Sequence, residues 1–219
     1  MITVPETVQK IIKQSPFLEE GLEKGIMNLS ELARLLQPQV EKELFKNVSE
    51  ASIMMALKRM SGVHTKKRIH KVFSTVPDMI VRSHLIEITV QNSATLPQKQ
   101  KKLLEDTLGF SNTFFTITTG LFETTIIASE DLEQKIQTVL KGEKIITVFR
   151  KLSAITVRLT KEVVNIPGVY YHILKILAWD NINIFEVVSA YTEFTIILEE
   201  KDVDRAFSTL KNSLPTIKY

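Results

Sequence analysis

Two short stretches near the end of the chain, Asn165-Ile166-Pro167-Gly168-Val169 and Asp180-Asn181-Ile182-Asn183-Ile184, decide its fold. Between them apolar residues recur at helical spacing, with Pro in what we expect to be the first helical turn. Alternating apolar residues before the first stretch (155–159) predict a strand. After the second, residues 186–189 and 194–198 predict a hairpin, and a helix follows Asp202, which can cap it. This order predicts a βαββαβ unit.

The chain contains an internal repeat with an offset of 70 residues, which has to be recognised before motifs are interpreted. Residues 122–127, Phe-Glu-Thr-Thr-Ile-Ile, fall on residues 192–197, Thr-Glu-Phe-Thr-Ile-Ile, and Pro97 falls on Pro167. In the earlier copy, residues 85–90 alternate as a strand does. We therefore predict an α+β protein with a first βαββαβ domain at residues 80–150 and a second at 151–219.

The composition excludes several classes of protein. Apolar residues make up 44% and charged residues 24% of the 219, which suits a globular chain with a sizeable core. The absence of cysteine rules out disulfides and thiolate chemistry. Neither a membrane span nor a signal peptide is indicated. We expect a cytoplasmic protein without a metal site or cofactor.

The second copy resembles the ACT domain family, and within it the paired regulatory ACT domains of aspartate kinases. The resemblance extends from Asn165 to Leu210 and includes Ile166-Pro167-Gly168-Val169, the Asn-Ile-Asn-Ile stretch and residues 189–199. The first copy matches less well, because Leu96-Pro97-Gln98 has no glycine. The resemblance implies tandem ferredoxin-like domains that dimerise and bind an amino acid or a similar small effector at an ACT interface.

The resemblance also implies which residues contact the effector. They belong to the loop after the first strand, to the start of the second strand and to its end: Asn165, Ile166, Pro167, Gly168, Val169, Asn181, Asn183, Ile184 and Ser189. A glycine in the loop lets a carboxylate approach main-chain N–H groups at a helix N-terminus. The same residues can instead serve only the turn and the strand entry of the fold.

Two departures from the aspartate kinases limit the function. Lysine-sensing members carry an acidic residue where this chain has Phe185, so an apolar or small effector is favoured, and alternation places Glu186 on the opposite face. No glycine-rich phosphate loop and no catalytic constellation occurs in the sequence. We therefore expect a regulatory protein and no enzyme.

Residues 1–78 have a helical pattern, with helices near residues 4–14, after Pro16, after Asn28 and after Ser49. The last two resemble a helix-turn-helix or winged helix, although a connection at residues 37–47 would be long for that motif. Candidate nucleic-acid contacts are Ser49, Ser52, Lys58, Arg59, Lys66, Lys67 and Arg68. A helical domain for oligomerisation or for docking to a partner is the alternative.

Two functions follow from these patterns. In the first, an ACT pair senses an effector and changes the spacing of DNA-binding heads in a homodimer. In the second, a free-standing regulatory subunit binds an enzyme of amino-acid biosynthesis through its helical domain. An ACT dimer without ligand is the third possibility.

Overall fold

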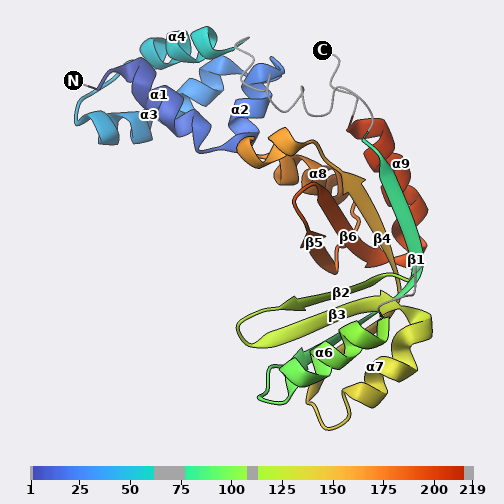
Figure 1. Ribbon diagram of the computed structural model, residues 1–219. Helices are drawn as coiled ribbons and strands as arrows, with labels where there is room; N and C mark the ends of the chain where they lie inside the picture. Colours follow the sequence, from blue (N-terminus) through green and yellow to red (C-terminus); the bar gives the residue numbers. More distant parts are fainter. Residues whose placement is uncertain (1, 62–76, 108–112, 215–219) are drawn as a thin grey trace. The chain divides into compact units, whose positions relative to one another are not determined.

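The computed structural model describes residues 2–61, 77–107 and 113–214 (Figure 1). The chain divides into a helical unit, Met1–Lys67, and a sheet-containing unit, Arg68–Tyr219. Each unit has its own hydrophobic core. The finer limits predicted from the sequence, 1–78, 80–150 and 151–219, stay predictions.

The described part of the helical unit contains four helices, each starting where the sequence predicts a start. They are α1 (Val4–Lys13), α2 (Pro16–Glu23), α3 (Leu29–Leu44) and α4 (Glu50–Met60). Side chains cap three of them: Thr3 forms a capping box with Glu6, Asn28 accepts from the first turn of α3, and Ser49 accepts from Ser52 N.

The predicted long connection at residues 37–47 is wrong, because α3 continues through Pro38 to Leu44. Val40 is fully buried in the helical core, and this packing holds the segment helical despite the proline. The connection to α4 is then short. It is fixed by Glu41, whose carboxylate accepts from Val48 N at 2.9 Å, and by Gln37, whose amide donates to Val48 O at 2.8 Å.

The sheet-containing unit is α+β, with one six-stranded antiparallel sheet in the order β2-β3-β1-β4-β6-β5. Its strands are β1 (Met79–Gln91), β2 (Phe115–Thr119), β3 (Glu123–Ser129), β4 (Ile145–Arg158), β5 (Glu186–Ser189) and β6 (Glu193–Glu199). Its helices are α6 (Leu96–Thr107), η1 (Glu130–Leu132), α7 (Glu133–Val139), η2 (Lys161–Asn165), α8 (Val169–Trp179), η3 (Glu200–Asp202) and α9 (Val203–Ser213).

The two copies of the repeat share their two longest strands. Residues 85–91 of β1 pair with β3, whereas residues 79–82 pair with the end of β4, at residues 154–157. The register between β1 and β4 shifts near the middle of each strand, where His84 (φ 58°) and Lys151 (φ 55°) adopt left-handed conformations. We call the part built on β2, β3, α6 and α7 the first half, and the part built on β5, β6, α8 and α9 the second half.

Each half buries one sheet face under its own helices (Figure 1). In the first half Ile88, Ile126 and Leu103 are in that core, and in the second half Ile155, Ile196 and Ile173. Residues with the opposite alternation form the second face of the sheet, which is also buried at its centre. Its apolar centre contains Leu85, Ile127, Leu152, Ala154 and Ile197, with Phe114, Phe185 and Val188 packed against it.

The stretch Asp180-Asn181-Ile182-Asn183-Ile184, which we expected to begin a strand, instead follows the end of helix α8. Asn181 is left-handed (φ 53°), and Asn181 N and Ile182 N donate to Ala178 O and Leu177 O of the last turn of α8. Residues 180–185 therefore precede β5, which begins at Glu186. Asp202 precedes α9 as predicted, but its carboxylate accepts from Arg205 rather than from the helix backbone.

Candidate effector site

The loop between β4 and α8 presents an uncovered helix N-terminus. Gly168 is the N-cap of α8 and has φ 88°, a conformation that disfavours any side chain. Because α8 begins at Val169, Pro167 precedes the helix, and its expected place in the first helical turn is wrong. Gly168 O accepts from His172 N at 2.9 Å, and the N–H groups of the first turn have no acceptor within the helix. Gly168 is exposed, whereas Val169 is buried in the core. The loop is thus anchored by its apolar residues and open at its glycine.

An aromatic stack lies beside this N-terminus. The ring of Tyr170, the second residue of α8, stacks on Phe194 of β6 with centroids 4.6 Å apart. Phe194 is the partner of Ser189, the last residue of β5. Ser189 therefore lies at the same end of the second half as Gly168. Nothing in the sequence selects Tyr170, because its contact with Phe194 depends on how α8 packs against β6.

The other predicted contacts lie at the far end of α8. Eleven residues separate the two ends, which is roughly 16 Å along the axis. Asn181 and Asn183 are exposed there, and Ile184 packs against the core. Asn165 is exposed at the end of η2 and Ile166 is half-buried, both at the Gly168 end. Within one chain the two groups do not meet.

In the first half, the chain's own Glu143 fills the corresponding corner. The carboxylate of Glu143 accepts from Ser93 Oγ and Thr95 Oγ1, each at 2.6 Å, and lies 2.7 Å from Lys99 Nζ. Ser93 Oγ also accepts from Leu96 N at the start of α6. The bond from Lys99, followed by those from Ser93 and Thr95, lowers the pKa of Glu143 to about 2.

The repeat offset places Ser213, the last residue of α9, at the position of Glu143. This equivalence holds for the sequence offset only, because Ser213 is still helical whereas Glu143 follows the end of α7 at Val139. The difference is visible in the sequence, but only the contacts of Glu143 show that its carboxylate binds Ser93, Thr95 and Lys99.

The predicted nucleic-acid contacts are placed only in part. Ser49 and Ser52 lie at the start of α4 with their hydroxyls 2.8 Å apart, and Lys58 and Arg59 lie in its last turn. Lys66, Lys67 and Arg68 lie outside the described residues. Acidic residues accompany this surface, because Arg34 pairs with both Glu31 and Glu50.

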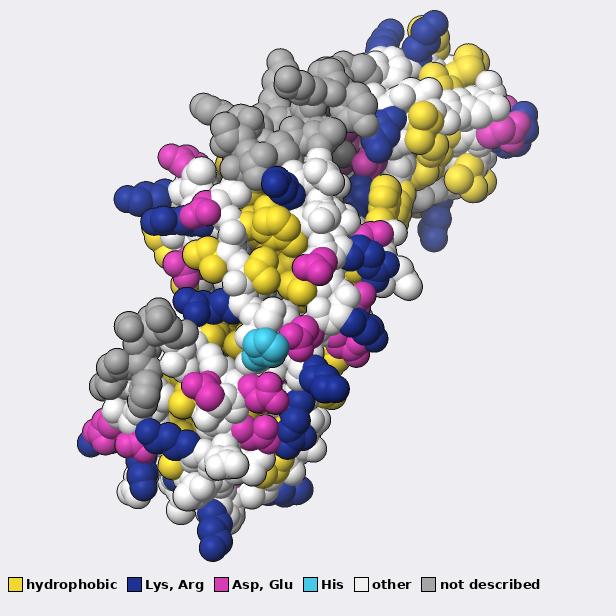
Figure 2. Space-filling model, turned by 90° about the vertical axis from the view of Figure 1, so that its right-hand side faces the viewer, with side chains coloured by type: hydrophobic (Ala, Val, Ile, Leu, Met, Phe, Trp, Pro, Cys, Tyr) yellow, Lys and Arg dark blue, Asp and Glu magenta, His cyan; other side chains and the backbone are white. Residues whose placement is uncertain are grey.

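The helical unit also exposes several large apolar side chains. They are Ile2, Phe17, Ile26, Leu35, Phe45 and Met55. Figure 2 shows hydrophobic side chains at the surface in the upper part of the view, among acidic and basic ones. Single exposed apolar residues are ordinary, but six among residues 2–61 are compatible with a protein partner.

Among the described residues, no cluster of three or more His, Asp or Glu side chains could hold a metal ion. None of the helices at residues 2–61, 77–107 and 113–214 is both long and apolar enough to cross a membrane.

About two thirds of the chain is similar in fold to regulatory domains of aspartate kinases. No protein-family model and no curated protein matches the chain. Among solved structures, aspartate kinase from Clostridium acetobutylicum matches 64% of this chain with a TM-score of 0.53 and 13% identity. The match covers 35% of that kinase, so the chain spans about a third of its length.

The ligand-free regulatory subunit of aspartate kinase from Thermus thermophilus matches the same share of this chain, with a TM-score of 0.52 and 11% identity, and is covered to 99%. Aspartate kinase from Synechocystis gives 0.52 at 14% identity, and 27% of it is covered. At such identities the likeness concerns the fold alone. It establishes a mixed α+β, ACT-like fold with a curled antiparallel sheet.

Proposed function

We propose that the protein is a non-catalytic regulator whose second half binds an amino acid or a similar small effector at the loop before α8. The observation that carries the proposal is the difference between the two halves at this corner. In the first half the corner is filled by the Glu143 carboxylate. In the second half the left-handed Gly168 leaves the helix N-terminus open.

The chemistry of the open corner suits a carboxylate. Main-chain N–H groups in the first turn of α8 and the positive end of the helix dipole favour an anion. The stacked Tyr170 and Phe194 rings give the corner an apolar wall.

A second copy of the chain completes the site. Asn181, Asn183 and Ile184 lie at the opposite end of α8 from Gly168, so they reach an effector at Gly168 only from a neighbouring protomer. The amide of Asn183 offers a donor and an acceptor for the two polar ends of an amino acid. We therefore place the effector at a homodimer interface.

A thermal shift scan against the twenty amino acids tests this proposal, since a ligand that binds only the folded state raises its Tm. We expect one or a few amino acids to raise the Tm, and the Gly168→Asp variant to lose this response. Gly25→Asp is the matched control: Gly25 is also left-handed (φ 66°) with open space around it, but it lies in the helical unit. An equal response of both variants would remove the loop from the site.

The helical unit is the output of the regulator, either as a DNA-binding head or as a docking domain. A coupling of about 1–3 kcal/mol between effector and output would suffice. The exposed apolar side chains of this unit and the Glu31–Arg34–Glu50 network favour docking to a protein, such as an enzyme of amino-acid biosynthesis, over phosphate contacts.

Retention on random-sequence DNA as a function of salt separates the two outputs, because phosphate contacts weaken steeply as salt rises. Binding at low salt that disappears with added salt, and weakens in Lys58→Ala/Arg59→Ala, would support the DNA-binding head. Equal elution from DNA and from an uncharged resin would support the regulatory subunit.

A further inference from the structure

A bulge in β4 lies where this strand passes from the first half to the second. Glu87 of β1 pairs with Phe149 of β4. Between this pair and the next, β1 has one residue and β4 has two, Arg150 and Lys151. An extra residue of this kind bends the strand and redirects its side chains. Lys151 is left-handed (φ 55°), which is uncommon for lysine, and backbone strain of this kind clusters at ligand sites.

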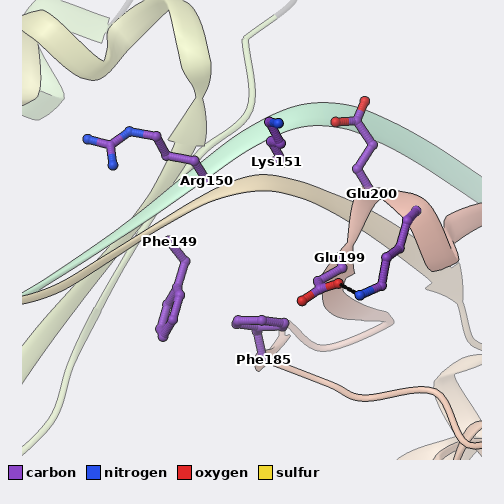
Figure 3. Close-up of a pocket in the computed structure, with 7 residues that line it drawn as sticks. Phe149, Arg150, Lys151, Phe185, Glu199 and Glu200 are labelled. Carbon is purple, nitrogen blue, oxygen red and sulfur yellow. Dashed lines mark ion pairs between the residues drawn. The ribbon is translucent and has the colours of Figure 1, made fainter.

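Phe149, Arg150 and Lys151 line a pocket of about 460 Å³ (Figure 3). Its other lining residues come from the segment before β5 and from the passage of β6 into η3: Phe185, Glu199, Glu200 and Lys201. This volume is within the range of pockets that bind small organic molecules. No residue of the loop before α8 lines it, so the pocket is distinct from the proposed effector site.

Two aromatic rings form an apolar wall of the pocket. The rings of Phe149 and Phe185 are in edge contact, with centroids 4.9 Å apart, and Phe149 is 39% exposed. Phe185 is held in place because its N–H donates to Ile197 O at 2.8 Å and its ring packs against the centre of the second face. Glu186, as the partner of Ile197, lies on this face too. The alternation that placed Phe185 and Glu186 on opposite faces is therefore wrong.

Two of the three cations that line the pocket are already paired. Arg150 donates from Nη2 to Glu133 at 2.5 Å, and Figure 3 shows its side chain extending away from the two rings. Lys201 forms an ion pair with Glu199. Neither cation is therefore available to a ligand without breaking an existing contact.

Lys151 is the remaining cation. Among the described residues, none forms a hydrogen bond or an ion pair with its ammonium group. The remaining acid of the pocket, Glu200, has its Oε1 at 3.4 Å from His84 Nδ1. The pocket thus combines one unpaired positive charge with an exposed aromatic wall.

We propose that this pocket binds a small aromatic monocarboxylate, with Lys151 as the counter-charge and the rings of Phe149 and Phe185 as the wall. A flat ring packs well edge-on or offset against other aromatic rings. One unpaired ammonium group balances one carboxylate. A phosphate dianion fits less well, because it would need a second cation or several N–H donors, and Glu199 and Glu200 would repel it.

Calorimetric titration of the full chain at pH 7 tests the proposal with phenylacetate as the probe. Phenylacetamide has a similar shape without the charge, and acetate has the charge without the ring. We expect saturable binding of phenylacetate, tighter by about fivefold or more than that of either control compound. Phe149→Ala should weaken this binding by a similar factor, and it should fold because the ring is partly exposed.

Substitutions at Lys151 test the counter-charge. Lys151→Asn removes the charge, and asparagine tolerates the left-handed conformation better than most residues. It should weaken phenylacetate binding by about fivefold or more and leave phenylacetamide binding unchanged. Lys151→Arg keeps the charge and should retain the binding. Lys144→Asn is the matched control, because Lys144 is exposed just before β4 and does not line the pocket.

The outcomes separate this pocket from the effector site. Gly168→Asp should leave phenylacetate binding unchanged, and Lys151→Asn should leave any response of the Tm to amino acids unchanged. Loss of phenylacetate binding in Gly168→Asp but not in Lys151→Asn would place the ligand at the loop before α8 and overturn the proposal. No binding by the unmodified protein, equal binding of phenylacetamide, or full affinity in a folded Lys151→Asn or Phe149→Ala variant would also overturn it.

Discussion

Glu87 makes the stability of the protein depend on pH in the sense opposite to an ordinary paired carboxylate. Its pKa is about 7 in the folded chain and about 4.5 when the chain is unfolded. Between these values the folded state binds more protons than the unfolded state, so the free energy of unfolding falls as pH rises. The destabilisation is absent below pH 4.5 and complete above pH 7.

The size of this effect follows from the two pKa values. At about 1.4 kcal/mol per pH unit, the difference sets an upper limit of about 3 kcal/mol. Water reaches the half-buried Glu186 and screens its charge, which lowers the expected value to about 2 kcal/mol. Glu186 of β5 is the charged group that raises the pKa of Glu87. The neighbours of Glu87 on β1, β3 and β4 are the apolar residues Leu85, Ile127 and Phe149.

Glu87→Gln removes the ionisation and keeps the shape of the side chain. Urea unfolding of both proteins from pH 5 to pH 8.5, without ligand, gives the difference in the free energy of unfolding. We expect nearly equal stability at pH 5 and a variant more stable by about 2 kcal/mol at pH 8.5. Glu123→Gln should give a flat difference. A difference for Glu87→Gln that does not change with pH, or that grows in the opposite direction, would refute the reasoning.

Three further predictions concern other parts of the chain. The pKa of Glu143 is lowered to about 2, so its carboxylate stabilises the fold above pH 4.5 and loses this effect as pH falls toward 2. Glu143→Gln should therefore lower the Tm at pH 7, and the difference in Tm between the variant and the unmodified protein should be smaller at pH 2.5. Asn28→Ala removes the acceptor for the Ser30 and Glu31 amides and should cost about 1 kcal/mol in urea unfolding, whereas no loss would mean that water replaces the cap. Phe194→Ala should cost about 3–5 kcal/mol, because the ring is 2% exposed; a loss below 1 kcal/mol would contradict the packing described here.

The sequence predicted the local elements well because their signals are local. Alternation and helical spacing located the hairpin of β5 and β6 and the helices α8 and α9, and caps located the starts of α1, α3 and α4. The repeat and the Pro167-Gly168 turn indicated the ACT-like fold. Errors arose where packing outweighed a local signal, as at Pro38 inside α3 and at residues 180–185, which end a helix rather than begin a strand.

Most helices and strands, and the recurrence of residues 122–127 at residues 192–197, can be recognised in the sequence alone. The pairing of β1 and β4 with both halves, the contacts of Glu143 in the corner of the first half, and the burial of Glu87 between Ile127 and Phe149 depend on the tertiary structure. The physical reason is that periodicity records which side of an element is buried, whereas strand order, register and curl determine which distant residues meet.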